Sequence, residues 1–307
     1  MKLTNKFSFF PIYSHARLER ILKRPIFSHD RILFASSSDG LNWKDLDIPV
    51  LSCQKVRGSM TYFAAVNIQK SSFYALSSGW DKKAKSWRQF LFCDGIWRSC
   101  FSLGIPEIHA LSVCNNVMYG IEKFSSPKFS KIRAYTLDPS IWPEKEIEQS
   151  WPEIARELQD LSIIYSQDRY IAIGTINKHA NQSKLLLFYS LDGKKWELRH
   201  EVYLKGISGE GFLSNPNLCL LDNGEFRLYF RAGTKPAVGN SIYSAVSSDL
   251  NSWDIESGKR IGPHGKWANH GVGFPCVWKS KDLYFMAYGA YWGDNKYGER
   301  VKEHWTS

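Results

Sequence analysis

The chain has 307 residues, of which 43% are hydrophobic and 15% aromatic, and its formal net charge is +10. No apolar run approaches the ~18–20 residues that a membrane-spanning helix needs, so we expect no membrane span. Lys and Arg are scattered along the chain and form no recognisable nucleic-acid-binding module, so we expect no nucleic-acid partner. A diffuse positive surface favours solubility or an anionic ligand, such as an acidic polysaccharide or a nucleotide-sugar.

The N-terminal segment and the cysteines indicate the compartment. The first eleven residues are basic, then briefly apolar, then interrupted by Pro11, which makes a poor signal peptide and predicts a cytoplasmic protein. The six cysteines include no C-x-x-C pair and mostly lie in apolar runs, which predicts buried thiols rather than disulfides. His264, His270 and His304 are too dispersed for a metal triad, and we expect neither a metal nor a cofactor.

The predicted elements, taken in chain order, are nearly all strands. Residues 1–28 are expected to be an N-terminal extension with a short helix at 14–23, and residues 29–307 a single domain. Two strands are predicted at 31–36 and 43–51. Four units follow, each with up to four strands, at 58–101, 105–150, 152–204 and 209–262; the strands of the last unit are 217–221, 227–232, 242–247 and 253–261. Two further strands are predicted at 273–278 and 283–288.

A recurring phrase of the type Ser-x-Asp-Gly-x-x-Trp separates these strands. It occurs at 37–43, 190–196 and 247–253, with looser relatives around Asp94 and Asp138. Each copy lies between two apolar runs, so it is predicted to be a hairpin turn in which Asp accepts backbone N–H bonds and Gly supplies a positive φ. The Asp positions are 55, 44, 54 and 57 residues apart (Asp39, Asp94, Asp138, Asp192, Asp249). This spacing predicts a repeat architecture with four-stranded units.

The half units at the two ends of the chain specify how the repeats close. Four complete units and one shared unit predict an all-β, five-bladed β-propeller. Its last blade combines the C-terminal strand pair on the inside with the N-terminal pair on the outside, which removes exposed sheet edges. A β-sandwich with coincidental Asp-Gly turns is the alternative, but it does not explain the matching half units.

Blade-like motifs in the C-terminal third resemble a known superfamily. Residues 215–230 read NPNLCLLDNGEFRLYF, residues 244–253 read SAVSSDLNSW, and FPCVW at 274–278 precedes LYFMAYG at 283–289. These motifs resemble the five-bladed propeller glycosidases: the arabinanase and β-xylosidase group, the invertase and levansucrase group, and the mannoside phosphorylases. The resemblance covers about residues 30–290. It implies a saccharide or sugar-derived ligand bound where the inner strands begin around a central channel. The net charge of +10 adds the expectation that this ligand is anionic.

The resemblance also implies which residues act, because cleavage of a glycosidic bond needs a proton donor and a base or nucleophile. Glu210, in a Gly-Glu-Gly segment, is similar to the general acid of several of these families, and Asp160 lies where they often have an orienting carboxyl. The candidate catalytic residues at the expected strand starts are Glu210, Asp160, Glu107 and His270. The candidate substrate-binding residues are Arg57, Asn269, His109, Asn215 and Trp267.

One departure from the superfamily keeps the alternatives open. The relatives usually place a carboxylate on the first blade's inner strand, whereas this chain has Asn269-His270-Gly271 there. The leading hypothesis is a glycoside hydrolase-like enzyme that uses acid/base carboxylate chemistry. The alternatives are an enzyme of different chemistry on the same fold, a non-hydrolytic propeller that binds a saccharide or an anionic sugar derivative, and an interaction scaffold.

Overall fold

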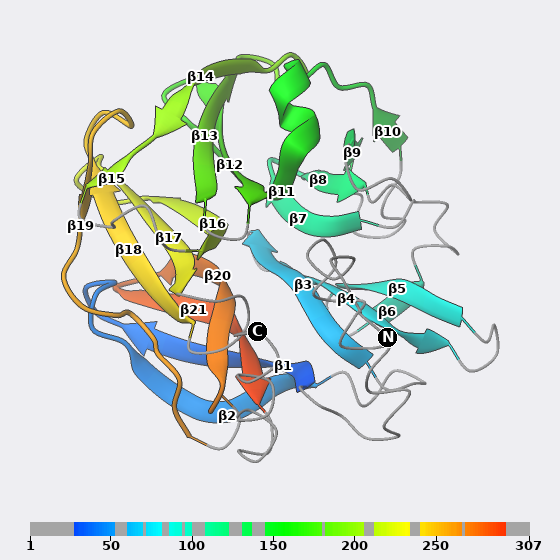
Figure 1. Ribbon diagram of the computed structural model, residues 1–307, viewed down its shortest axis with the longest axis vertical. Helices are drawn as coiled ribbons and strands as arrows, with labels where there is room; N and C mark the ends of the chain where they lie inside the picture. The colour runs from blue at the N-terminus through cyan, green and yellow to red at the C-terminus, as the bar shows by residue number, and fades with distance from the viewer. Residues whose placement is uncertain are drawn as a thin grey trace, which may run out of the picture.

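The computed structural model describes residues 28–52, 60–69, 72–81, 86–93, 96–99, 108–122, 131–136, 145–179, 182–205, 212–233, 240–265 and 268–292. These residues form an all-β propeller (Figure 1), as the sequence predicts. The helix expected at 14–23 lies outside the described residues. Within them, no helix has the length and hydropathy of a membrane span.

The described strands form five sheets, which follow one another along the chain. The chain ends share one sheet of order β2-β1-β21-β20, with bounds Lys44–Ser52, Ser28–Ser37, Leu283–Trp292 and Gly271–Ser280. The second sheet contains β3 to β6 in chain order, with bounds Met60–Gln69, Ser72–Asp81, Ser86–Cys93 and Ile96–Ser99. The third contains β7 to β10, with bounds Ile108–Cys114, Val117–Glu122, Lys131–Thr136 and Lys145–Ile147. The fourth contains β11 to β14, with bounds Leu158–Ser166, Arg169–His179, Gln182–Ser190 and Glu197–Val202. The fifth has the order β16-β17-β18-β19-β15, with bounds Phe212–Leu220, Phe226–Gly233, Ser241–Ser247, Trp253–Ile255 and Leu204–Lys205.

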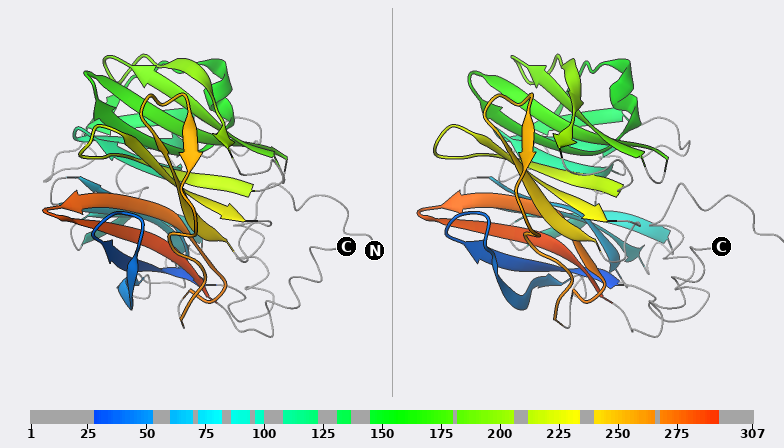
Figure 2. Two further views of the ribbon diagram at one scale, coloured as in Figure 1. Left: turned by 90° about the vertical axis from the view of Figure 1, so that its left-hand side faces the viewer. Right: turned by 60° about the vertical axis from the view of Figure 1, so that its left-hand side comes forward.

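The inner strands of the five sheets surround a common axis (Figures 1 and 2). β3 contacts β7, β7 contacts β11, β11 contacts β16, β16 contacts β20, and β20 contacts β3 again. A polar side chain links successive inner strands. The backbone N–H donors and their acceptors are Ile163 to Ser112 Oγ at 2.9 Å, Leu218 to Ser162 Oγ at 3.0 Å, and Val277 to Asn217 Oδ1 at 2.9 Å. Buried donors of adjacent sheets are thereby satisfied.

Apolar cores lie between neighbouring sheets. The middle strand β17 is covered on both sides, and seven of its eight residues are buried. Trp253, Tyr119, Tyr229, Tyr288 and Phe188 are the largest fully buried side chains in the described part of the chain. The high aromatic content therefore fills the space between sheets, where large rings contribute most of the buried area.

The sheet shared by the chain ends confirms the predicted union of the half units. β1 pairs with β21 in antiparallel register, with Leu33 opposite Tyr288 and Ala35 opposite Met286. The C-terminal pair is inner and the N-terminal pair outer, as expected. Because β1 and β21 are paired along their lengths, neither presents an open edge.

The recurring phrases form the predicted turns. Asp39 Oδ1 accepts the N–H groups of Leu41 and Asn42 at 2.8 Å each, and Gly40 adopts φ +72°. Asp192 and Asp249 accept the same pair of backbone N–H bonds in their turns. In these two turns the Oγ atoms of Ser190 and Ser247 also accept the backbone N–H of the residue three positions later. The backbone N–H donors hold the pKa of these carboxyls below the ordinary value. The related turns at Asp94 and Asp138 lie outside the described residues.

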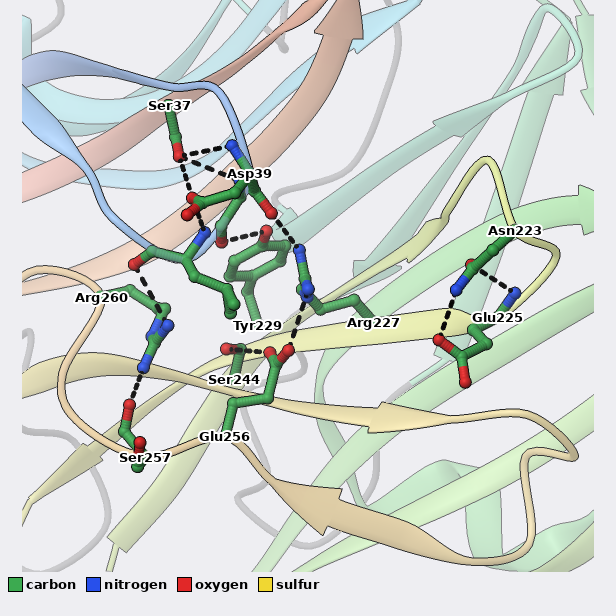
Figure 3. Close-up of polar contacts among 12 residues, drawn as sticks. Ser37, Asp39, Asn223, Glu225, Arg227, Tyr229, Ser244, Glu256, Ser257 and Arg260 are labelled. Atoms are coloured by element: carbon green, nitrogen blue, oxygen red, sulfur yellow. Dashed lines mark hydrogen bonds and ion pairs between the residues drawn. The ribbon is translucent and has the colours of Figure 1, made fainter.

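The Asp39 turn is held by the neighbouring sheet (Figure 3). The Tyr229 hydroxyl donates to the Gly40 carbonyl at 2.8 Å, and Arg227 Nη1 donates to the Asp39 carbonyl at 2.9 Å. The other arm of Arg227 forms a buried ion pair with Glu256 at 2.9 Å, and Glu256 also accepts a bond from Ser244. These charges are satisfied within the protein, so we interpret this network as structural.

One predicted strand is wrong in its extent. The strand expected at 253–261 ends at Ile255, and residues 256–265 form a connection that meets the sheet again at an isolated bridge between Ile261 and Ile242 of β18. Gly258 has φ +82°, which breaks the extended backbone. The Arg260 side chain then donates to the Leu41 carbonyl at 3.1 Å, which also ties this connection to the N-terminal hairpin.

Candidate functional site

The described site residues lie near the starts of the inner strands. Asp160 is the third residue of β11, and Asn215 is the fourth residue of β16. Asn269 and His270 immediately precede β20. His109 lies on β7. Arg57, Glu107, Glu210 and Trp267 lie outside the described residues, so their roles stay predictions.

Asp160 and Asn215 form the central contact of the site. Asn215 donates its backbone N–H to Asp160 Oδ2 at 3.1 Å and its side-chain Nδ2 to Asp160 Oδ1 at 2.9 Å. Both carboxyl oxygens of Asp160, on β11, thus accept hydrogen bonds from Asn215, a single residue of the next inner strand, β16. This arrangement fixes the carboxyl in position and orientation.

The local backbone explains how Asn215 reaches Asp160. The register between β16 and β17 shifts between Ser214 and Asn217, where a β-bulge interrupts the pairing. Asn215 has φ +52° and precedes Pro216, which removes a donor from the strand. Asn is among the few residues that tolerate the left-handed region. The bulge turns both donors of Asn215 toward the neighbouring sheet.

Arg231 is the cation that faces this contact. It lies on β17 opposite Ser214, is 8% exposed, and donates from Nε to Ser214 Oγ at 2.8 Å. Its guanidinium carbon lies 5.6 Å from the centroid of the Phe274 ring, which belongs to β20. Arg231 therefore links its own sheet to the sheet of β20, near the start of their inner strands.

Phe274 repeats the backbone arrangement of Asn215 on the next inner strand. It also has φ +52°, also precedes a proline, and also lies in a register shift, here between Gly273 and Cys276. A bulky residue in this conformation is strained and persists only when its surroundings hold it. Gly289 makes room for it, because a Cβ there would lie 3.0 Å from Phe274 Cδ2.

The electrostatics of Asp160 follow from these contacts. Removal of the carboxyl from water raises its pKa above the ordinary value, while the Asn215 N–H donor, the charge of Arg231 and the Asn215 amide partly offset the increase. A carboxyl in such a position accepts hydrogen bonds in a fixed orientation and holds its proton more tightly than an exposed aspartate does. Perturbed carboxyls of this kind gather at functional sites.

The start of β20 carries the neutral and basic groups expected there. His270 is 7% exposed, whereas Asn269 is exposed. The sequence of β20 from Gly271 to Ser280 contains neither Asp nor Glu. This inner strand therefore lacks the carboxylate that the glycosidases resembled by the sequence usually place there.

Sequence reasoning missed Ser214, Arg231 and Phe274. A charged residue inside the apolar run 226–232 is a signal that could have identified Arg231. Its partners could not be identified this way, because they belong to other strands.

The fold has known relatives among solved structures. No family model matches the sequence, and no curated protein matches it either. An α-L-arabinofuranosidase from Podospora anserina, solved with cellotriose, is 10% identical with a TM-score of 0.53, over 77% of this chain and 93% of its own.

Two further structures are similar to the same degree. A β-fructofuranosidase of glycoside hydrolase family 32 from Bombyx mori is 13% identical with a TM-score of 0.51, over 76% of this chain and 56% of its own. A thermostable family-43 glycoside hydrolase is 16% identical with a TM-score of 0.50, over 76% of this chain and 88% of its own. At these identities the likeness is one of fold, and it agrees with the propeller that the repeat phrases predict.

Proposed function

We propose that this chain is a carbohydrate-active protein that acts on a glycosidic bond at the starts of its inner strands, by acid/base carboxylate chemistry. The observation that carries the proposal is the environment of the Asp160 carboxyl. This carboxyl is shielded from water, accepts hydrogen bonds from two donors of Asn215, and lies near the positive charge of Arg231. The similarity in fold to glycoside hydrolases supports it.

The contacts of Asp160 suggest how the roles are divided. Both of its oxygens already accept hydrogen bonds from Asn215, which suits an orienting carboxyl better than a nucleophile. We therefore assign Asp160 and Asn215 to positioning, Glu210 to proton donation and Glu107 to the second catalytic carboxyl. His270, Asn269, His109, Arg57 and Trp267 are assigned to ligand contact.

The architecture belongs to the same proposal. We take each of the five sheets as one blade of a five-bladed propeller, with residues 29–307 as a single domain and 1–28 as an extension. The closed circle of inner strands supports this count. The cytoplasmic location stays a prediction from the sequence.

Activity on a panel of aryl glycosides and oligosaccharides tests the enzyme. Glu210→Gln should lower kcat by about 10²–10⁴-fold, because a proton donor contributes on this order. Glu201→Gln is the matched control, since that carboxylate pairs with Lys184 on the surface between β13 and β14, and it should retain full activity. Equal turnover of Glu210→Gln and wild type would refute the assignment of the acid.

A second function, non-hydrolytic binding of an anionic saccharide, is favoured by one specific observation. The start of β20 presents Asn269 and His270 rather than an acid, and the buried Arg231 lies nearby across the Phe274 ring. Glycan binding without product formation would support this function. Binding that His270→Ala and Arg57→Ala leave unchanged would exclude the channel as its site.

A further inference from the structure

Three side chains meet at the sheet formed by the chain ends, away from Asp160. They are Asp45 on β2, Tyr288 on β21 and His264 in the connection between β19 and β20. His264 Nε2 lies 2.7 Å from Asp45 Oδ2 and 3.3 Å from the Tyr288 hydroxyl. The same hydroxyl donates a hydrogen bond to Asp45 Oδ1.

The contacts define the protonation state of His264. Its second ring nitrogen, Nδ1, lies 2.7 Å from the Gly262 carbonyl oxygen. The carbonyl only accepts hydrogen bonds, so Nδ1 carries a proton, and the contact between Nε2 and Asp45 Oδ2 needs one further proton shared by the ring and the carboxyl. The Tyr288 hydroxyl favours the ionised form of Asp45, because it donates to the carboxylate. The pair is therefore an imidazolium bound to a carboxylate.

The position of the pair gives it a role in the fold. Asp45 belongs to the N-terminal hairpin, and Tyr288 belongs to the C-terminal one. The backbone N–H of His264 donates to the carbonyl of Ala268, at 3.1 Å, and Ala268 lies two residues before His270. The His264 and Asp45 side chains are 28% and 19% exposed, so water screens their attraction only in part. The His264 ring thus contacts side chains from both chain ends, while its backbone is bonded to the segment that leads into the candidate site.

We propose that Asp45, His264 and Tyr288 form a protonation-controlled latch that fastens the connection 256–265 to the sheet of the chain ends. When His264 is an imidazolium the latch is closed, and loss of its second proton opens it. The latch is independent of the proposed sugar chemistry, because none of its three side chains belongs to the candidate site.

The direction of the pH dependence follows from the charges around the ring. Asp45 faces it from β2, Tyr288 faces it from β21, and Lys259 lies beside Gly262 on its own connection. The carboxylate favours the charged ring, so the folded state holds this proton more tightly than the unfolded chain, where histidine titrates near ~6.5. The stabilisation is fully present below that pH and is lost as the pH rises further and the folded ring gives up its proton.

Thermal unfolding of the full chain from pH 5.5 to 9 tests the latch. His264→Gln should lower Tm by about 2–4 °C at pH 5.5, and the gap to wild type should shrink by at least half at pH 9. Asp45→Asn should give the same pattern, and the double variant should be no less stable than the worse single variant, because the two residues act as a unit. Parallel curves of wild type and His264→Gln across this range would overturn the proposal.

Two controls separate the latch from general effects. His200→Gln removes a histidine whose Nε2 lies 3.2 Å from the Leu250 carbonyl oxygen, and a gap to wild type that shrinks with pH as much as that of His264→Gln would overturn the proposal. Ring ¹⁵N shifts of His264, assigned by their loss in His264→Gln, should show an imidazolium at pH 7. A neutral ring at pH 7 would refute the latch even if a variant failed to fold.

Discussion

The hydroxyl of Tyr229 donates a hydrogen bond to the carbonyl of Gly40, which lies 189 residues earlier in the chain. Tyr119 makes the same contact with Gly193, at 3.2 Å, from the preceding sheet to the Asp192 turn. The middle strand of one sheet therefore holds the outer turn of the next. This contact repeats because the turn phrase repeats.

Tyr229→Phe should destabilise the protein modestly. The Gly40 carbonyl keeps a second donor, Trp43 Nε1 at 3.0 Å, so it is not left unsatisfied. The expected loss is about 0.5–1.5 kcal/mol in the free energy of unfolding, measured by urea titration. Tyr243→Phe, on a half-buried ring that stacks on Phe230, is the control and should change stability by less than about 0.5 kcal/mol.

Gly40→Ala should cost more than Gly224→Ala, although both glycines have a positive φ. A Cβ at Gly40 would lie 2.4 Å from Arg227 Nη1 and 2.8 Å from the Tyr229 hydroxyl, whereas a Cβ at Gly224 meets nothing within 4 Å. Gly224→Ala therefore reports backbone strain alone, about 1 kcal/mol. Comparable losses for the two variants in the same unfolding assay would show that the Asp39 turn is not held as described.

The free energy of unfolding of Asp160→Asn, relative to that of wild type, should increase as the pH rises. Burial raises the pKa of Asp160, so the native state binds its proton more tightly than the unfolded chain does. Ionisation of the native carboxyl therefore costs stability above the ordinary value of ~3.9, and the variant avoids this cost. Unfolding free energies at pH 4 and pH 8 measure the change, and a gap between variant and wild type that does not vary would contradict it.

Asp192→Ala should show the opposite pH dependence. Backbone N–H groups of Lys195 and Lys194 lower the pKa of Asp192, so its carboxylate stabilises the fold above the ordinary value and ceases to do so as the pH falls through the lowered one. The variant should be less stable than wild type at pH 7, and the difference should narrow below about pH 4. Melting curves at pH 7 and pH 2.5 provide the test.

The fold was predictable because its turns are encoded locally. A Ser-x-Asp-Gly-x-x-Trp segment supplies its own acceptors and its own positive φ, so the turns at Asp39 and Asp192 needed no knowledge of distant residues. The same logic extends to Asp249, where Leu250 takes the positive φ at +65° in place of Gly. The union of the chain ends followed from counting half units.

The details that depend on distant contacts were not predictable. After the end of β19 at Ile255, the connection contains Arg260, which bonds a carbonyl 219 residues away. At the site, the sequence predicted Asp160 and Asn215 but not their contact, which requires a β-bulge and a positive φ in the next strand. Arg231 was missed because its significance comes from Ser214 and Phe274 on neighbouring strands.

The sheet that unites the two chain ends has a consequence for biosynthesis. β1 ends at Ser37, and its partner β21 begins at Leu283, so about 245 residues must be translated between them. At about 5–20 residues per second, the N-terminal hairpin waits roughly 12–50 s with one edge unpaired. During that interval the nascent chain presents a strand that can recruit a foreign segment, and chaperone protection is most valuable then.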